Sequence, residues 1–68
     1  MKQYQIRVVD EKTDLDGKIE RLEAFIGTPA YHDLEHHDQF LLRFQLVAMR
    51  QYSTTLGERI ARFDLSHD

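Results

Sequence analysis

The chain has 68 residues, no cysteine and a formal net charge of −3. A chain of this length forms one domain and buries only about 60% of the surface exposed when it is unfolded, so its core is marginal. The missing cysteines exclude disulfides, the acidic excess argues against duplex nucleic acid, and no stretch approaches the ~20 apolar residues of a membrane span. We therefore expect a cytoplasmic protein, with residues 1–68 as a single unit.

The first predicted element is a long amphipathic helix over residues 2–26. Its apolar residues recur at spacings of three, four or seven positions: Tyr4, Val8, Leu15, Ile19, Leu22 and Ile26. These spacings place them on one face of a helix with a period of 3.6 residues. The opposite face is charged, so this helix is expected to pack along one side only.

Residues 27–36 predict a bend that contains a short helical turn. Gly27 is expected to end the first helix in the left-handed conformation. Thr28 then supplies an N-cap, and Pro29 is the preferred residue of a first helical turn. Leu34 is the expected inward anchor of this otherwise polar segment.

A second long helix is predicted over residues 36–63, with a frayed tail at 64–68. Its seam repeats at alternating spacings of four and three: Leu42, Leu46, Met49, Ser53, Leu56, Ile60 and Phe63. Two long helices joined by a short bend pack as antiparallel neighbours. The predicted fold is thus an all-α antiparallel helical hairpin, in a register that places Leu22 near Leu46 and Leu15 near Ser53.

The first half of the second helix carries a further apolar stripe. Phe40, Phe44 and Val47 lie outside the seam, where the first helix cannot reach them. Burying one such side chain is worth roughly 1.5–3 kcal/mol, so three exposed ones favour self-association into a dimer or a higher even oligomer. Tyr31 and Leu34 are expected at the edge of that interface. In the alternative, the bend folds back and these two residues cover the stripe.

A polar belt in the second helix is the candidate ligand site. The residues with suitable chemistry are Lys12, Arg50, Tyr52, Thr54 and Arg59. A tyrosine ring can stack on a base, while hydroxyl and guanidinium groups can hold a phosphate. In the alternative, Ser53 bonds back to a carbonyl of its own helix and the rest of the belt is solvated surface.

The histidines do not complete a metal or catalytic site. His32 and His36 are four residues apart, a spacing that can share a metal if nearby carboxylates complete the shell, but the cluster lies at a predicted bend, which favours a solvated turn. A catalytic serine in the second helix would stand roughly 25 Å from the bend histidines. We therefore expect no metal, no cofactor and no enzymatic activity.

Five segments of the sequence carry a resemblance to known proteins: R-V-V-D-E-K from Arg7, L-D-G-K-I-E-R-L from Leu15, F-I-G-T-P-A-Y from Phe25, L-L-R-F-Q-L-V-A-M-R-Q-Y-S from Leu41 and E-R-I-A-R-F from Glu58. Through them the chain resembles a family of short uncharacterised helical proteins of tailed phages and prophages, including crAss-like phages. The resemblance implies a phage accessory protein acting in the host bacterial cytoplasm. Some phage counter-defence proteins are likewise small helical-hairpin oligomers that sequester cyclic nucleotide immune signals, which is an analogy of architecture.

Our leading hypothesis is a homo-oligomeric binding protein that sequesters a small anionic ligand, such as a nucleotide immune signal. The first alternative is a protein–protein interaction module that blocks or adapts a host protein through the apolar face of the second helix. The second alternative is a structural component of the virion.

Overall fold

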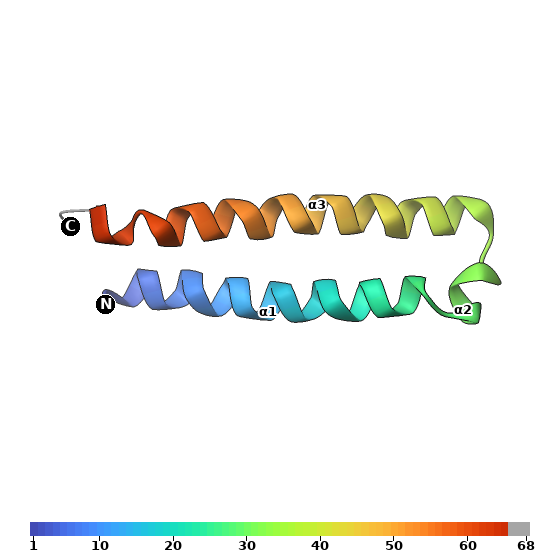
Figure 1. Ribbon diagram of the computed structural model, residues 1–68, viewed down its shortest axis with the longest axis horizontal. Helices are drawn as coiled ribbons and strands as arrows, with labels where there is room; N and C mark the ends of the chain where they lie inside the picture. Colours follow the sequence, from blue (N-terminus) through green and yellow to red (C-terminus); the bar gives the residue numbers. More distant parts are fainter. Residues whose placement is uncertain (66–68) are drawn as a thin grey trace.

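The computed structural model of the protein describes residues 1–65. Within that range its elements are α1 (Gln3–Ile26), α2 (Pro29–His32), α3 (His36–Ala61) and a 3₁₀ turn at Phe63–Leu65. Helices α1 and α3 run antiparallel and side by side, with α2 at the end where they are joined (Figure 1). The predicted all-α antiparallel hairpin is confirmed. Of the tail expected to fray, residues 66–68 lie outside the described residues.

Local hydrogen bonds set both ends of α1. At the start, the side-chain oxygen of Gln5 accepts a bond from the backbone N–H of Lys2 at 2.8 Å. At the end, the predicted left-handed conformation of Gly27 is wrong, because its φ is −82°. The N–H groups of Gly27 and Thr28 instead bond to carbonyls three residues earlier, at 3.2 and 3.0 Å. These tighter bonds satisfy the last carbonyls without a positive φ.

The bend is built on the predicted cap. The hydroxyl of Thr28 accepts a bond from the N–H of Tyr31 at 3.4 Å and donates one to the carbonyl of Phe25 at 2.6 Å. Pro29 occupies the first turn of α2, where a missing N–H has no cost. The cap expected at Thr28 and Pro29 is therefore confirmed.

Tyr31 lies inside the hairpin and not at its outer edge, where the sequence had placed it. Its side chain is only 3% exposed, and its ring packs edge-on against Phe25 with the centroids 6.2 Å apart. Its hydroxyl donates to the carbonyl of Gln39 in α3 at 3.1 Å. The amide of Gln39 in turn donates to the carbonyl of Leu34 at 2.8 Å. Tyr31 thus connects α2 to the start of α3 through a hydrogen bond. Because its side chain is buried, Tyr31 cannot contact a neighbouring molecule in this conformation.

The C-terminal end of α3 stops short of the expected position. Helix α3 ends at Ala61, because the N–H of Arg62 bonds to the carbonyl of Arg59 at 3.1 Å and tightens the last turn. Phe63 then lies in the 3₁₀ turn, edge-on to Tyr4 of α1 with ring centroids 6.1 Å apart. This aromatic pair closes the open end of the hairpin.

The core is a single seam between two helices. Among the described residues, the buried apolar side chains are Val8, Tyr31, Leu46 and Leu56, and only Leu56 is completely buried. The molecule measures 51 × 15 × 13 Å, and its radius of gyration of 15.6 Å exceeds the roughly 11 Å of a compact chain of this length. No helix within residues 1–65 is long and apolar enough to cross a membrane. A rod of this shape leaves much apolar surface uncovered.

Candidate functional site

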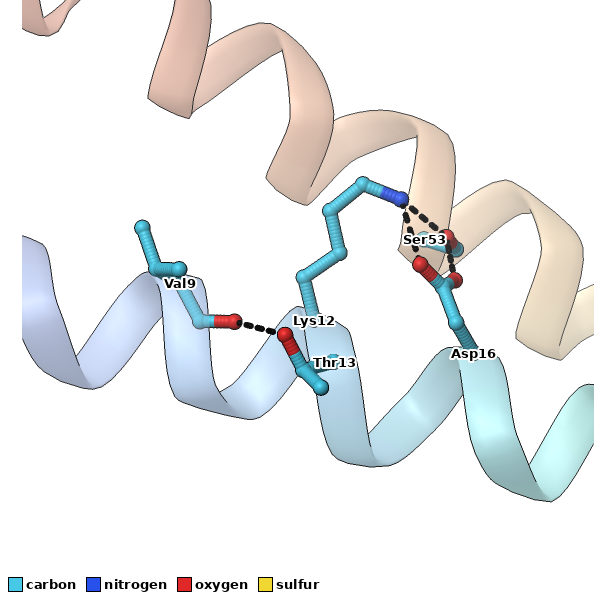
Figure 2. A network of polar contacts seen from close by, with 5 residues as sticks. All are labelled: Val9, Lys12, Thr13, Asp16 and Ser53. Atoms are coloured by element: carbon cyan, nitrogen blue, oxygen red, sulfur yellow. Dashed lines mark hydrogen bonds and ion pairs between the residues drawn. The ribbon is translucent and has the colours of Figure 1, made fainter.

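A polar network of Lys12, Asp16 and Ser53 joins α1 to α3 (Figure 2). The ammonium nitrogen of Lys12 donates to Asp16 Oδ2 and to Ser53 Oγ, both at 2.9 Å. The Ser53 hydroxyl donates to the other oxygen of Asp16. Because the buried Ser53 hydroxyl donates to Asp16 of α1, the alternative in which it bonds back to a carbonyl of its own helix is wrong. Ser53, the polar residue in the seam of α3, therefore finds its hydrogen-bond partners in α1.

We call the network of Lys12, Asp16 and Ser53 the clasp, because its hydrogen bonds hold α1 against α3. The hydrogen bond from Ser53 and then that from Lys12 hold the pKa of Asp16 below its ordinary value, because both favour the carboxylate. Lys12 donates to both Asp16 and Ser53, and the Ser53 hydroxyl donates to Asp16. Ser53 lies inside α3, where neighbouring N–H groups are committed to helical bonds and cannot form an oxyanion hole. The arrangement holds the register of the two helices.

Gly57 makes room for the lysine of the clasp. A Cβ at Gly57 would lie 3.3 Å from Cε of Lys12, which is tighter than usual van der Waals contact. A Cβ at Gly17 would meet only the end of Arg21 in its own helix, at 3.4 Å. Only Gly57 of these two therefore marks a close contact between the helices.

Two of the predicted ligand residues bind carboxylates of α1. Arg50 forms an ion pair with Glu23, and the Tyr52 hydroxyl donates to Glu11. Because Arg50 and Tyr52 are two residues apart, they point about 200° from each other around α3 and flank opposite sides of the seam. These partners leave fewer free donors for a ligand than the sequence alone indicated.

The five predicted ligand residues therefore do not form one cluster. By helical periodicity Thr54 shares the flank of Arg50, and Arg59 shares that of Tyr52. Both Thr54 and Arg59 are exposed, and Arg59 forms no ion pair with any residue in the described range. Lys12 already donates hydrogen bonds to Asp16 and Ser53 within the clasp. No ligand contact tests these positions, so their role in binding remains a prediction.

Sequence reasoning missed the acidic partners Asp16, Glu11 and Glu23. One signal was available, since Asp16 follows Lys12 by four residues and neighbours Leu15, which the predicted register places opposite Ser53. Glu11 was assigned to the charged, solvent-facing side of the first helix, and Glu23 was given no role. Their partners become evident only when the rotation of each helix is known.

The outer face of α3 is exposed as a continuous patch. Phe40, Phe44 and Val47 expose 58%, 64% and 51% of their surfaces, so the bend does not cover them and that alternative is wrong. Together with Arg43 these residues line a shallow hollow of about 230 Å³. The rings of Phe40 and Phe44 have centroids 6.0 Å apart at an angle of 30°. We call these four residues the outer hollow.

His32 and His37 lie near the bend, and each contacts an aromatic ring. His32 packs edge-on against Tyr31 with ring centroids 5.3 Å apart, and His37 stacks on Phe40 at 6.5 Å. Across residues 1–65 no group of three His, Asp or Glu side chains could hold a metal ion. The ring of His37 extends the aromatic surface of the outer hollow toward the bend.

The fold and the site define a small helical-hairpin protein with a clasped seam and an exposed aromatic face. Comparison with known proteins identifies the family to which the chain belongs. The sequence profile of the Sequestin family matches residues 2–62, and the chain belongs to the Sequestin family. It is also 35% identical over 60 residues to a protein of Enterobacteria phage T4, described as an uncharacterized 7.5 kDa protein in the denB-rIIB intergenic region. That alignment covers 88% of this chain and 94% of the T4 protein. No solved structure matches the chain.

Proposed function

We propose that this protein is a non-enzymatic, homo-oligomeric phage protein that sequesters a small nucleotide immune signal in the host bacterial cytoplasm. The observation that carries this proposal is the match of residues 2–62 to the Sequestin family, whose name refers to sequestration. The likeness to a T4 protein over almost its whole length supports a phage origin. Removing such a signal would counter a defence that depends on it.

The geometry supports binding better than catalysis. Lys12 and Asp16 of the clasp pair within α1 and both bond to Ser53 of α3, and Arg50 of α3 pairs with Glu23 of α1. The outer hollow is exposed and combines the aromatic rings of Phe40 and Phe44 with the guanidinium group of Arg43. Sequestration needs only a tight site present in sufficient copies, and it requires no reacting side chain.

The proposed function is tested by a thermal-shift panel of cyclic di- and trinucleotides and ADP-ribose derivatives. A ligand that binds only the folded protein increases the free energy of unfolding by mass action, by about 2.7 kcal/mol at a ligand concentration of 100 times Kd. This increase raises the melting temperature. We expect at least one of these compounds to raise the melting temperature at micromolar concentration. If none does so at millimolar concentration, sequestration of these ligand classes is excluded.

The exposure of Phe40, Phe44 and Val47 also favours a second candidate function. Apolar patches rimmed by polar residues mark protein–protein contacts, so α3 could block or adapt a host protein. The two candidates predict different complexes in infected cells. A host-protein blocker would be recovered in a fixed ratio with one host chain, whereas a sequestering protein would be recovered with copies of itself and a small molecule.

A further inference from the structure

The outer hollow combines aromatic faces with a guanidinium group that forms no ion pair within the described residues. We propose that the hollow formed by Phe40, Arg43, Phe44 and Val47 is the ligand site, and that it binds the planar base and the phosphate of a nucleotide. This inference rests on the proposed function and adds to it the place of binding. It moves the site away from the polar belt that the sequence had indicated.

The aromatic part of the hollow suits a flat ring. The side chains of Phe40 and Phe44 are each more than half exposed, and their rings lie 6.0 Å apart between centroids with a tilt of 30°. His37 stacks on Phe40 at an interplanar angle of 18°, which lengthens the surface. Stacking of bases on aromatic side chains tolerates any base, because every base has a π face.

Arg43 supplies the charge that this surface needs. It adjoins Phe44 in the sequence, lines the same hollow, and forms no ion pair with any residue of the described range. By contrast, Lys12 is bonded to Asp16, and Arg50 is bonded to Glu23. An anionic ligand at either of those cations would have to displace a carboxylate. A planar guanidinium without an acidic partner can accept a phosphate through two parallel hydrogen bonds.

The size of the hollow points to a second wall from another copy of the chain. Its volume of about 230 Å³ is below the range of roughly 300–1,000 Å³ in which proteins enclose small ligands. All four of its lining residues come from two turns of one helix, so one face of a bound ligand would stay in water. A two-fold partner would present the same residues from the other side. The site is therefore complete only in the self-associated protein.

Single tryptophans test the location directly, because the chain contains no tryptophan. Phe44→Trp places the only indole in the outer hollow, and Tyr52→Trp places it in the polar belt as a matched control. The probes are ADP-ribose, cyclic di-AMP and cyclic di-GMP, each added to a variant of confirmed oligomeric mass. We expect quenching of the indole fluorescence in Phe44→Trp and an unchanged signal in Tyr52→Trp. Quenching in Tyr52→Trp alone would overturn the location.

A charge variant gives the second measurement and leaves the apolar surface intact. Arg43→Gln should weaken binding of the same probe by roughly 10- to 150-fold, the usual effect of losing a hydrogen bond to a charged group. Arg59→Ala, which removes an exposed cation on another part of α3, should change the affinity less than twofold. The reverse order of effects would overturn the site while sequestration stands. If the unaltered protein binds none of the three probes at millimolar concentration, the site is overturned together with the nucleotide ligand.

Discussion

Asp16 is the residue on which the clasp between the helices depends. It accepts from Ser53 of α3 and from Lys12 of α1, and both bonds lower its pKa below the ordinary value of 3.8. A group whose pKa is lower in the folded state stabilises the fold above its unfolded pKa. That contribution is lost as the pH falls through the folded value.

Replacing Asp16 with asparagine should therefore have an effect that depends on pH. At pH 7, Asp16→Asn should lower the melting temperature, because the carboxylate no longer holds Lys12 and Ser53. Below pH 3.8 the difference from the unaltered protein should shrink and then close, since the native carboxyl group also becomes neutral. Thermal melts from pH 7 to pH 2 measure this difference. Asp14→Asn, at an exposed position of α1, removes the same charge outside the clasp and should show no such closing gap.

The two glycines inside the helices should respond differently to alanine. Gly17→Ala should stabilise the protein by about 1 kcal/mol, because alanine favours helix and its methyl meets only the flexible end of Arg21. Gly57→Ala should give a smaller gain, because its methyl would press on Lys12 Cε while the lysine is held by the clasp. Chemical denaturation of both variants provides the comparison. A gain at Gly57 equal to that at Gly17 would show that the contact has no energetic effect.

At the scale of the elements, the seam between α1 and α3 depends on Leu56. This side chain is fully buried, so Leu56→Ala should lower the free energy of unfolding by about 2–5 kcal/mol. Ile6→Ala is the control, since Ile6 is 46% exposed on α1 and its truncation should cost about 0.5 kcal/mol or less. Urea unfolding followed by circular dichroism measures both. Equal costs would mean that the seam is not the centre of stability.

Hydrophobic periodicity was enough to predict the two long helices and their antiparallel packing, because a seam repeated over several turns allows few other arrangements. The cap at Thr28 and Pro29 followed from local chemistry, which needs no tertiary information. The buried position of Tyr31 could not be predicted, since its hydroxyl bonds to Gln39 only after α2 has folded back toward α3. The acidic partners of the belt depend likewise on how each helix is rotated, and periodicity fixes that rotation only approximately.

At the scale of the whole molecule, a rod with three large apolar side chains exposed on one face should associate. We expect light scattering at micromolar concentration to give a mass that is an even multiple of 8.1 kDa. Phe44→Glu combined with Val47→Glu should dissociate the oligomer, because two charges would have to be buried at the contact. Thr13→Glu combined with Ala24→Glu adds the same charge at exposed positions of α1 and should leave the mass unchanged. An unaltered protein that stays monomeric throughout this range would remove the structural basis of the account.

We propose that the self-associated protein carries a nucleotide in the infected cell. Native mass spectrometry of the complex purified from infected bacteria is the decisive measurement, because one spectrum reports both the number of chains and any bound small molecule. We expect an even multiple of the 8.1 kDa chain together with a non-covalent mass that is released on denaturation and identified as a nucleotide. A single chain without a ligand, or a fixed complex with one host protein, would overturn this proposal.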